Sequence, residues 1–239
     1  MSDGFVLQEP QQEQPKEDGK HLNFISREHM LFATPFWQTK VEGVDNEPIK
    51  EYCYYLRDNT EGVVISNRGG WHSKEILQPI PDELKNFFNQ VQGWANNYCA
   101  QITGITDLVL GNWWVNINPK HTYNRRHDHQ KSILSGVYYV DCEGENVGQL
   151  VVERDDNMEF FAGRYQNSSP ICMNSFNMLP YTGFLLMFPA WTHHSVEANL
   201  EDRDRISIAF NLVDPQMGNS GHDVVHTSCL LYTSDAADE

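Results

Sequence analysis

The sequence lacks several features that would each define a class of protein. It has no run of about 18 apolar residues, so we expect no membrane-spanning helix. The first twenty residues are polar and do not show the basic-then-apolar order of a secretory signal. Basic residues are scarce, with 17 Lys and Arg against 33 Asp and Glu and a formal net charge of −16. We therefore expect a cytoplasmic protein that does not bind nucleic acids by general electrostatic attraction.

Cysteine is also sparse and carries no pattern. The five cysteines are scattered and include no Cys-x-x-Cys pair: Cys53, Cys99, Cys142, Cys172 and Cys229. An odd, dispersed set argues against a disulfide framework and against a cysteine metal site. We expect reduced thiols, most of them buried as small apolar side chains.

Composition divides the chain into a domain and two ends. Residues 1–25 are rich in Gln, Glu, Pro and Lys, which predicts a disordered N-terminal segment. Residues 229–239 read as the in-frame translation of a sequencing adapter, so we set them aside. Residues 30–215 have the apolar content of a single globular domain.

The first part of this domain predicts helices. A strand-like apolar run at 34–37 precedes Pro48, which suits a helix start. Residues 66–73 have the composition of a turn or loop. A second helix is expected to open at Pro81, because apolar residues then recur at helical spacing: Leu84, Phe87, Phe88, Val91, Trp94 and Ala95.

From residue 108 onward the sequence changes to short strands separated by Gly, Asn, Asp and Pro. The expected strands are 108–110, 113–118, 135–140, 149–153, 183–188, 194–197 and 205–212. This order of elements predicts a mainly β fold with flanking helices, in which a β-sandwich or barrel has its helices packed on one side.

A pair of histidines, His127 and His129, stands out among the ten in the chain. In an extended backbone these two side chains project to the same side, and Asp128 projects to the other. A turn is expected at 124–126 before the pair, and a strand follows it. A histidine pair at the mouth of a strand is a candidate metal site, although an ordinary polar turn gives the same pattern.

A third ligand is available after the apolar strand 183–188, where the chain turns at Pro189 and reaches His193 and His194. Adjacent strand residues face opposite ways, so only one of the two can join the pair unless the strand is bulged.

Arg205 opens a strand that alternates cleanly. It shares a face with Ser207, Ala209 and Asn211, while large apolar residues occupy the other face. A buried guanidinium needs an anion, and it suits a carboxylate because it donates two parallel hydrogen bonds. Either a structural ion pair or a bound carboxylate fits this pattern, and Ser207 would add a hydroxyl donor.

Together these segments resemble a family of 2-oxoglutarate/Fe(II)-dependent oxygenases common in phage and marine microbial sequences. The resemblance rests on four stretches and covers about residues 30 to 213: 31–35, 66–71, 124–129 running into 135–139, and 188–191 continuing through His194 to 205–207.

The resemblance implies a double-stranded β-helix of the jelly-roll or cupin type and a hydroxylase that uses Fe(II), 2-oxoglutarate and O2. It implies His127, His129 and His194 as the iron ligands and Arg205, accompanied by Ser207, as the anchor of 2-oxoglutarate. Asn116 and Tyr139 are expected to line the same pocket. If the gene is viral, the compartment is the host cytoplasm.

One departure from the family pattern concerns His129, because the broader superfamily has a carboxylate at that position. Three neutral imidazoles leave the metal its full charge, which favours a dianionic cosubstrate and also admits Zn(II) or Ni(II). Two alternatives stay open: a cupin-type three-histidine metalloenzyme without 2-oxoglutarate, and a non-catalytic barrel module of a virion. The substrate, whether protein, nucleotide or small molecule, is not indicated by the sequence.

Overall fold

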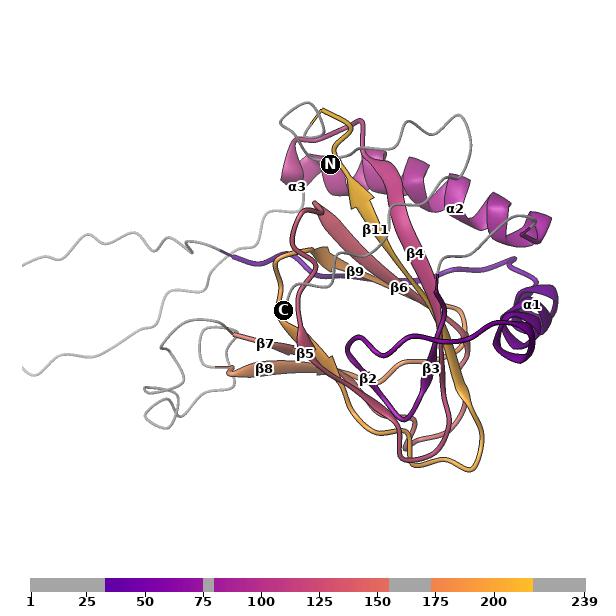
Figure 1. The fold of residues 1–239 in the computed structure, drawn as a ribbon. Coiled ribbons are helices and arrows are strands. Elements are labelled where there is room, and N and C mark those ends of the chain that lie inside the picture. The colour runs from indigo at the N-terminus through magenta and orange to yellow at the C-terminus, as the bar shows by residue number, and fades with distance from the viewer. Residues whose placement is uncertain (1–32, 75–79, 155–172, 217–239) are drawn as a thin grey trace, which may run out of the picture. The chain divides into compact units, whose positions relative to one another are not determined.

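The computed structural model describes residues 33–74, 80–154 and 173–216 (Figure 1). The chain divides into two compact units, 1–33 and 34–239, and every element below belongs to the second. The predicted disordered segment 1–25 and the adapter-like tail 229–239 lie outside the described residues. In the part that is described, no helix has both the length and the apolar character needed to cross a membrane.

Two antiparallel sheets form the body of the second unit. The six-stranded sheet has the order β1 (Trp37–Lys40), β9 (Phe184–Pro189), β6 (Leu134–Asp141), β11 (Arg205–Val213), β4 (Val109–Asn118) and β3 (Trp71–His72). The five-stranded sheet has the order β2 (Asn67–Arg68), β5 (Tyr123–His127), β10 (His194–Val196), β7 (Leu150–Glu153) and β8 (Ser175–Met178).

Between β4 and β11 the chain passes repeatedly from one sheet to the other. Strands β4, β6, β9 and β11 lie in the six-stranded sheet, and β5, β7, β8 and β10 lie in the five-stranded sheet. This exchange of strands between two facing antiparallel sheets is the jelly-roll arrangement. The predicted fold class, mainly β with flanking helices around a double-stranded β-helix, is confirmed.

The helices precede this core in the chain. α1 (Asn46–Asn59) begins after Asp45, whose carboxylate accepts a hydrogen bond from the backbone N–H of Glu47. α2 (Asp82–Trp94) continues through a π-helical turn, η1 (Ala95–Cys99), into α3 (Ala100–Thr103). Figure 1 shows α2 and α3 lying across the six-stranded sheet on the side away from β5, β7 and β8.

The expected apolar stripe of α2 packs on that sheet. Phe87 contacts Tyr138 with ring centroids 4.4 Å apart, and Phe88 contacts Trp113 at 5.0 Å. A second, smaller apolar cluster lies between the two sheets and consists of Tyr139, Cys142, Val147, Leu150, Leu186 and Phe188. The helices therefore stabilise the six-stranded sheet from outside and leave the inner face of the barrel free for a site.

Several sequence predictions need correction. The expected turn at 124–126 belongs to β5, and β8 was not predicted at all. The expected loop 66–73 contains the two short strands β2 and β3. The first strand begins at Trp37 rather than at residue 34, and the expected strands 108–110 and 113–118 are one continuous β4.

The described cysteines behave as expected. Cys53, Cys99 and Cys142 are free and buried. Burial raises the pKa of each thiol to about 12, so all three stay protonated near neutral pH. Cys172 and Cys229 lie outside the described residues.

Candidate metal and anion site

A cavity opens between the two sheets, with an empty volume of about 530 Å³ that includes space open to solvent. Its lining combines polar groups from β4, β5 and β11 with apolar side chains from β6, β7 and β9. The described lining residues are Ser66, Trp114, Asn116, Asn118, Asn124, His127, His129, Ser135, Gly136, Val137, Tyr139, Leu150, Phe188, His194, Val196, Arg205, Ser207 and Ala209. All seven residues that the sequence predicted for the site, His127, His129, His194, Arg205, Ser207, Asn116 and Tyr139, line this one cavity.

An irregularity in β5 turns His127 toward the cavity. Strand β10 pairs His194 with His127 and Val196 with Asn124. An advance of two positions along β10 therefore corresponds to three positions along β5, which is a bulge in β5. This bulge lets Asn124 and His127, which are three positions apart, both line the cavity. A regular strand would place them on opposite faces.

After β5 ends at His127, the side chains of Asp128 and His129 point in different directions. His129 lines the cavity, and its backbone N–H donates to the carbonyl of Ala190 at 2.9 Å. Asp128 faces the other way, where its carboxylate lies 3.4 Å from Nε2 of His193. His194, the neighbour of His193, is buried and lines the cavity. The alternation expected for both histidine-containing segments is therefore present.

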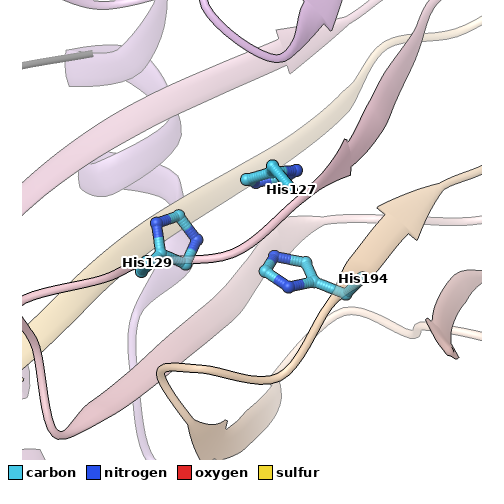
Figure 2. A group of neighbouring side chains, drawn as sticks. All are labelled: His127, His129 and His194. Atoms are coloured by element: carbon cyan, nitrogen blue, oxygen red, sulfur yellow. The ribbon is translucent and has the colours of Figure 1, made fainter. Parts of the chain in front are cut away.

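The three cavity histidines converge (Figure 2). One nitrogen from each of His127, His129 and His194 lies within 4.8 Å of the other two. The ring centroids are 4.3 Å apart for His127 and His194, 5.0 Å for His127 and His129, and 5.2 Å for His129 and His194. Metal–nitrogen bonds of about 2.0–2.1 Å need ligand nitrogens roughly 3 Å apart, so a small inward movement of the rings brings all three onto one ion.

Backbone carbonyls fix the orientation of two rings. Nδ1 of His127 lies 2.7 Å from the carbonyl oxygen of Arg125, and Nδ1 of His194 lies 2.9 Å from that of Thr192. A carbonyl accepts a hydrogen bond, so the proton of each neutral ring resides on Nδ1 and Nε2 keeps its lone pair. Both rings therefore offer Nε2 to a metal.

Burial also keeps the three imidazoles neutral. Burial, together with the neighbouring His127, lowers the pKa of His194 to about 3. The pKa of His129 falls well below its usual value, chiefly through burial, and that of His127 falls for the same reason. Neutral imidazole is the form that binds a metal, so the cluster is in its ligand form near neutral pH.

Arg205 occupies the inner part of the cavity and is 2% exposed. Its Nη1 donates to the backbone carbonyls of Val147, Gly148 and Glu197. Its Nη2 is buried and has no hydrogen-bond partner among the described residues. Burial lowers the pKa of the guanidinium, which nonetheless stays charged near neutral pH. The structural ion pair left open by the sequence is absent from the described residues, and an unpaired buried cation calls for an anionic ligand.

The position of Arg205 depends on a glycine. Gly148 has a φ of +82°, a conformation that side chains rarely adopt, and a Cβ there would lie 2.7 Å from Nη1 of Arg205. It would also collide with the carbonyl of Glu197. Only glycine allows the backbone to approach the guanidinium this closely.

Strand register places the other polar residues beside Arg205. Ser207 on β11 pairs with Asn116 on β4 and Tyr139 on β6, forming one row across the cavity. Asn118, which the sequence interpretation missed, is paired with Arg205. The side-chain carbonyls of Asn116 and Asn118 are buried without a hydrogen-bond partner among the described residues.

Trp114 connects the cavity to a fourth histidine, His72, which does not itself line the cavity. Trp114 lines the cavity and packs against His129 at 5.3 Å and against His72 at 5.6 Å. Two other tryptophans lie outside the cavity lining: Trp113 belongs to the core under α2, and Trp191 is 62% exposed. His72 escaped the sequence interpretation because it lies in a segment of loop composition, with no periodic pattern to place it.

Three histidines that could hold a metal ion and a buried arginine whose Nη2 has no partner among the described residues thus lie together inside a jelly roll. Residues 112–211 match the model of the family described as "Putative 2OG-Fe(II) oxygenase". This match confirms the resemblance drawn from the motifs, because residues 112–211 carry the sequence pattern of the 2OG-Fe(II) oxygenase family. The expected cofactors, Fe(II) and 2-oxoglutarate, are those that the family description names. None of the curated proteins matches the chain.

Solved structures agree on the fold. The chain is similar to a Trichoplax adhaerens prolyl hydroxylase in complex with a peptide of hypoxia inducible factor (TM-score 0.58, 13% identity, 79% of this chain and 87% of that one). It is also similar to the carbocyclase SnoK from nogalamycin biosynthesis (TM-score 0.57, 11% identity, 82% and 90%). A Pseudomonas putida prolyl-4-hydroxylase gives a TM-score of 0.52 at 14% identity, covering 77% and 95%.

Proposed function

We propose that the protein is a non-haem Fe(II)- and 2-oxoglutarate-dependent dioxygenase that hydroxylates its substrate. In the balanced reaction a substrate C–H, 2-oxoglutarate and O2 give the alcohol, succinate and CO2. Fe(II), when bound, supplies the redox chemistry of this reaction, and the protein supplies the ligands, the geometry and the cavity between the two sheets. The prolyl hydroxylases among the similar structures carry out a reaction of the proposed type by their titles.

The observation that carries this proposal is the unpartnered Nη2 of Arg205 in the same cavity as the three histidines. A three-histidine site alone fits many metalloenzymes. A buried guanidinium with a free donor fits a ligand that has a carboxylate at its inner end.

The proposed roles follow from position and chemistry. His127, His129 and His194 hold the metal through neutral nitrogens. Arg205 binds the distal carboxylate of 2-oxoglutarate through Nη2, while its Nη1 stays anchored to backbone carbonyls. Ser207 adds a hydroxyl donor, and the neighbouring Asn116 and Tyr139 orient the same molecule from either side.

The residues that surround the proposed site of the 2-oxoglutarate carboxylate, apart from Arg205, are uncharged and do not repel it. Burial holds the pKa of the Tyr139 phenol far above its usual range, so this side chain stays an uncharged donor. No described lining residue is an aspartate or a glutamate that would repel the carboxylates of 2-oxoglutarate.

The proposal is tested by loading the protein with Fe(II) anaerobically, admitting O2, and measuring succinate release with and without 2-oxoglutarate. We expect slow succinate formation even without substrate, only in the presence of both Fe(II) and 2-oxoglutarate. Folded protein that binds iron but yields no succinate and does not bind 2-oxoglutarate would support the cupin-type alternative. Folded protein that binds no metal either with or without 2-oxoglutarate would contradict the enzyme proposal altogether.

A further inference from the structure

The charges around the cavity are unbalanced. Among the described lining residues Arg205 is the one charged side chain, and no aspartate or glutamate is present. The acid closest in sequence to the metal ligands, Asp128, faces His193 outside the cavity. The site therefore holds a permanent positive charge with no anionic side chain among the described residues that line it.

A metal ion makes this imbalance larger. With three neutral ligands, a divalent metal keeps its charge of +2, and Arg205 brings the formal total to +3. Charges in a cavity of low effective dielectric repel strongly and are poorly screened. A carboxylate at position 129 would lower this total by one before any cosubstrate arrives.

2-Oxoglutarate is the proposed source of the missing negative charge. Its two carboxylates together carry −2, one beside the metal and the other at Arg205. The dianion therefore relieves both the uncompensated metal charge and the unpaired guanidinium in one binding event.

We propose that His129 makes metal binding depend on the cosubstrate. The metal alone binds weakly, and the metal and 2-oxoglutarate bind tightly only together. The inference rests on the proposed function. Any chelating cosubstrate strengthens metal binding to some degree, because it adds ligands. The inference concerns the extra coupling that arises because the protein provides no anionic ligand of its own.

The coupling is reciprocal and measurable without turnover. The factor by which 2-oxoglutarate tightens metal binding must equal the factor by which the metal tightens 2-oxoglutarate binding. Co(II) is a suitable probe because it gives no turnover, and both affinities are measured by titration calorimetry on the full chain. The readout is the coupling factor in each variant.

The variants His129→Asp and His129→Glu place a carboxylate in the metal site with two different reaches. We expect Co(II) alone to bind either variant roughly tenfold more tightly than it binds the wild type, with a smaller change when 2-oxoglutarate is present. The coupling factor should therefore fall by about tenfold relative to wild type. Two lengths of side chain guard against a poor fit of one of them.

Asn177→Asp is the matched control. Asn177 is exposed on β8, in the sheet that also contains β5 and β10. The change therefore adds the same charge outside the cavity. We expect the coupling factor of this variant to equal that of the wild type. A fall as large as that in the His129 variants would show that net charge, and not the metal site, is responsible.

The outcomes separate the two proposals. If Co(II) and 2-oxoglutarate both bind and the coupling factor is the same in the wild type and both carboxylate variants, the role of His129 is wrong and the proposed function stands. If the folded wild type binds neither ligand, the proposed function fails first. If only the His129 variants lose coupling while retaining both ligands, the inference holds.

Discussion

The two sheets that face each other across the cavity differ in the length of their strands. In the six-stranded sheet, β4, β6 and β11 are ten, eight and nine residues long and lie under the helices. In the five-stranded sheet no strand exceeds five residues. The six-stranded sheet contributes Arg205 and its polar neighbours. The five-stranded sheet contributes His127 and His194, and the turn after β5 contributes His129.

This difference shows how the site divides its tasks. The anion end rests mainly on the pairing of β11 with β4, which is regular from Arg205 to Phe210 and places Ser207 opposite Asn116. Ser207 also pairs with Tyr139 on β6, next to a register shift between Ile206 and Ser207. The metal end rests on local irregularities, namely the bulge in β5 and the turn that carries His129. Variants that act on one end and spare the other are therefore the sharpest tests.

The largest effect is expected at the metal end, from His194→Ala. This change removes a buried ligand, and we expect Co(II) affinity to fall by more than about 100-fold, because losing an outer partner of a ligand alone costs 10- to 100-fold. His193→Ala is the matched control, since His193 faces Asp128, and we expect less than about a threefold effect. Equal losses in both variants, measured by calorimetry, would mean that the alternation is misassigned.

At the anion end, Arg205→Met removes the buried cation and keeps an apolar side chain of similar reach. We expect the affinity of the Co(II)-loaded protein for 2-oxoglutarate to fall about 30-fold or more, because truncating one partner of a buried charge pair costs at least about 2 kcal/mol. Arg205→Lys keeps the charge without the paired donors and should recover part of the loss. Unchanged 2-oxoglutarate binding in Arg205→Met would assign the cosubstrate to another group.

A smaller effect is expected from Gly148→Ala, which acts on Arg205 through the backbone. A methyl group at the left-handed Gly148 would lie 2.7 Å from Nη1 of Arg205. We expect 2-oxoglutarate affinity to fall by roughly tenfold, which corresponds to about 1.4 kcal/mol. The variant should also lose roughly 1–3 kcal/mol of stability, because the conformation is strained for alanine. Metal affinity measured alongside should change little; a larger loss at the metal end would contradict a local effect.

The smallest effect concerns pH in the metal-free protein. His194 has a folded-state pKa of about 3, below the unfolded value of about 6.5, so the unfolded chain binds more protons between these values. Stability should therefore fall as the pH falls through this window, by up to about 1.4 kcal/mol per pH unit for this group. Urea unfolding between about pH 7 and pH 5 should show a shallower dependence in His194→Gln. An identical slope in both proteins would mean that His194 is not buried in its neutral form.

The same contrast explains what the sequence predicts. The alternation in β11 identifies Arg205 and Ser207 on one face, because residues on a long regular strand follow a period of two. Strand β5 escapes prediction because Tyr123, Arg125 and Arg126 are exposed and its cavity-facing residues are also polar. Strand β5 therefore has no alternation of apolar and polar residues, and its bulge also interrupts the alternation of exposed and cavity-facing residues. Asn118 lies two residues after Asn116 on β4, so the same period of two places it on the cavity face. His72 reaches Trp114 through the pairing of β3 with β4, which local pattern does not encode.

The adjacent His193 and His194 make the third metal position depend on the length of the turn that precedes β10. β10 has three residues, and its neighbour in sequence, His193, sits one step out of phase with His194. A one-residue insertion in the turn between Pro189 and Thr192 that shifts β10 would bring His193 to the position now held by His194, whereas a one-residue deletion would bring Ser195 there. A histidine therefore remains at the metal position after an insertion but not after a deletion. A chain with a single histidine there would lose its third ligand through the same insertion.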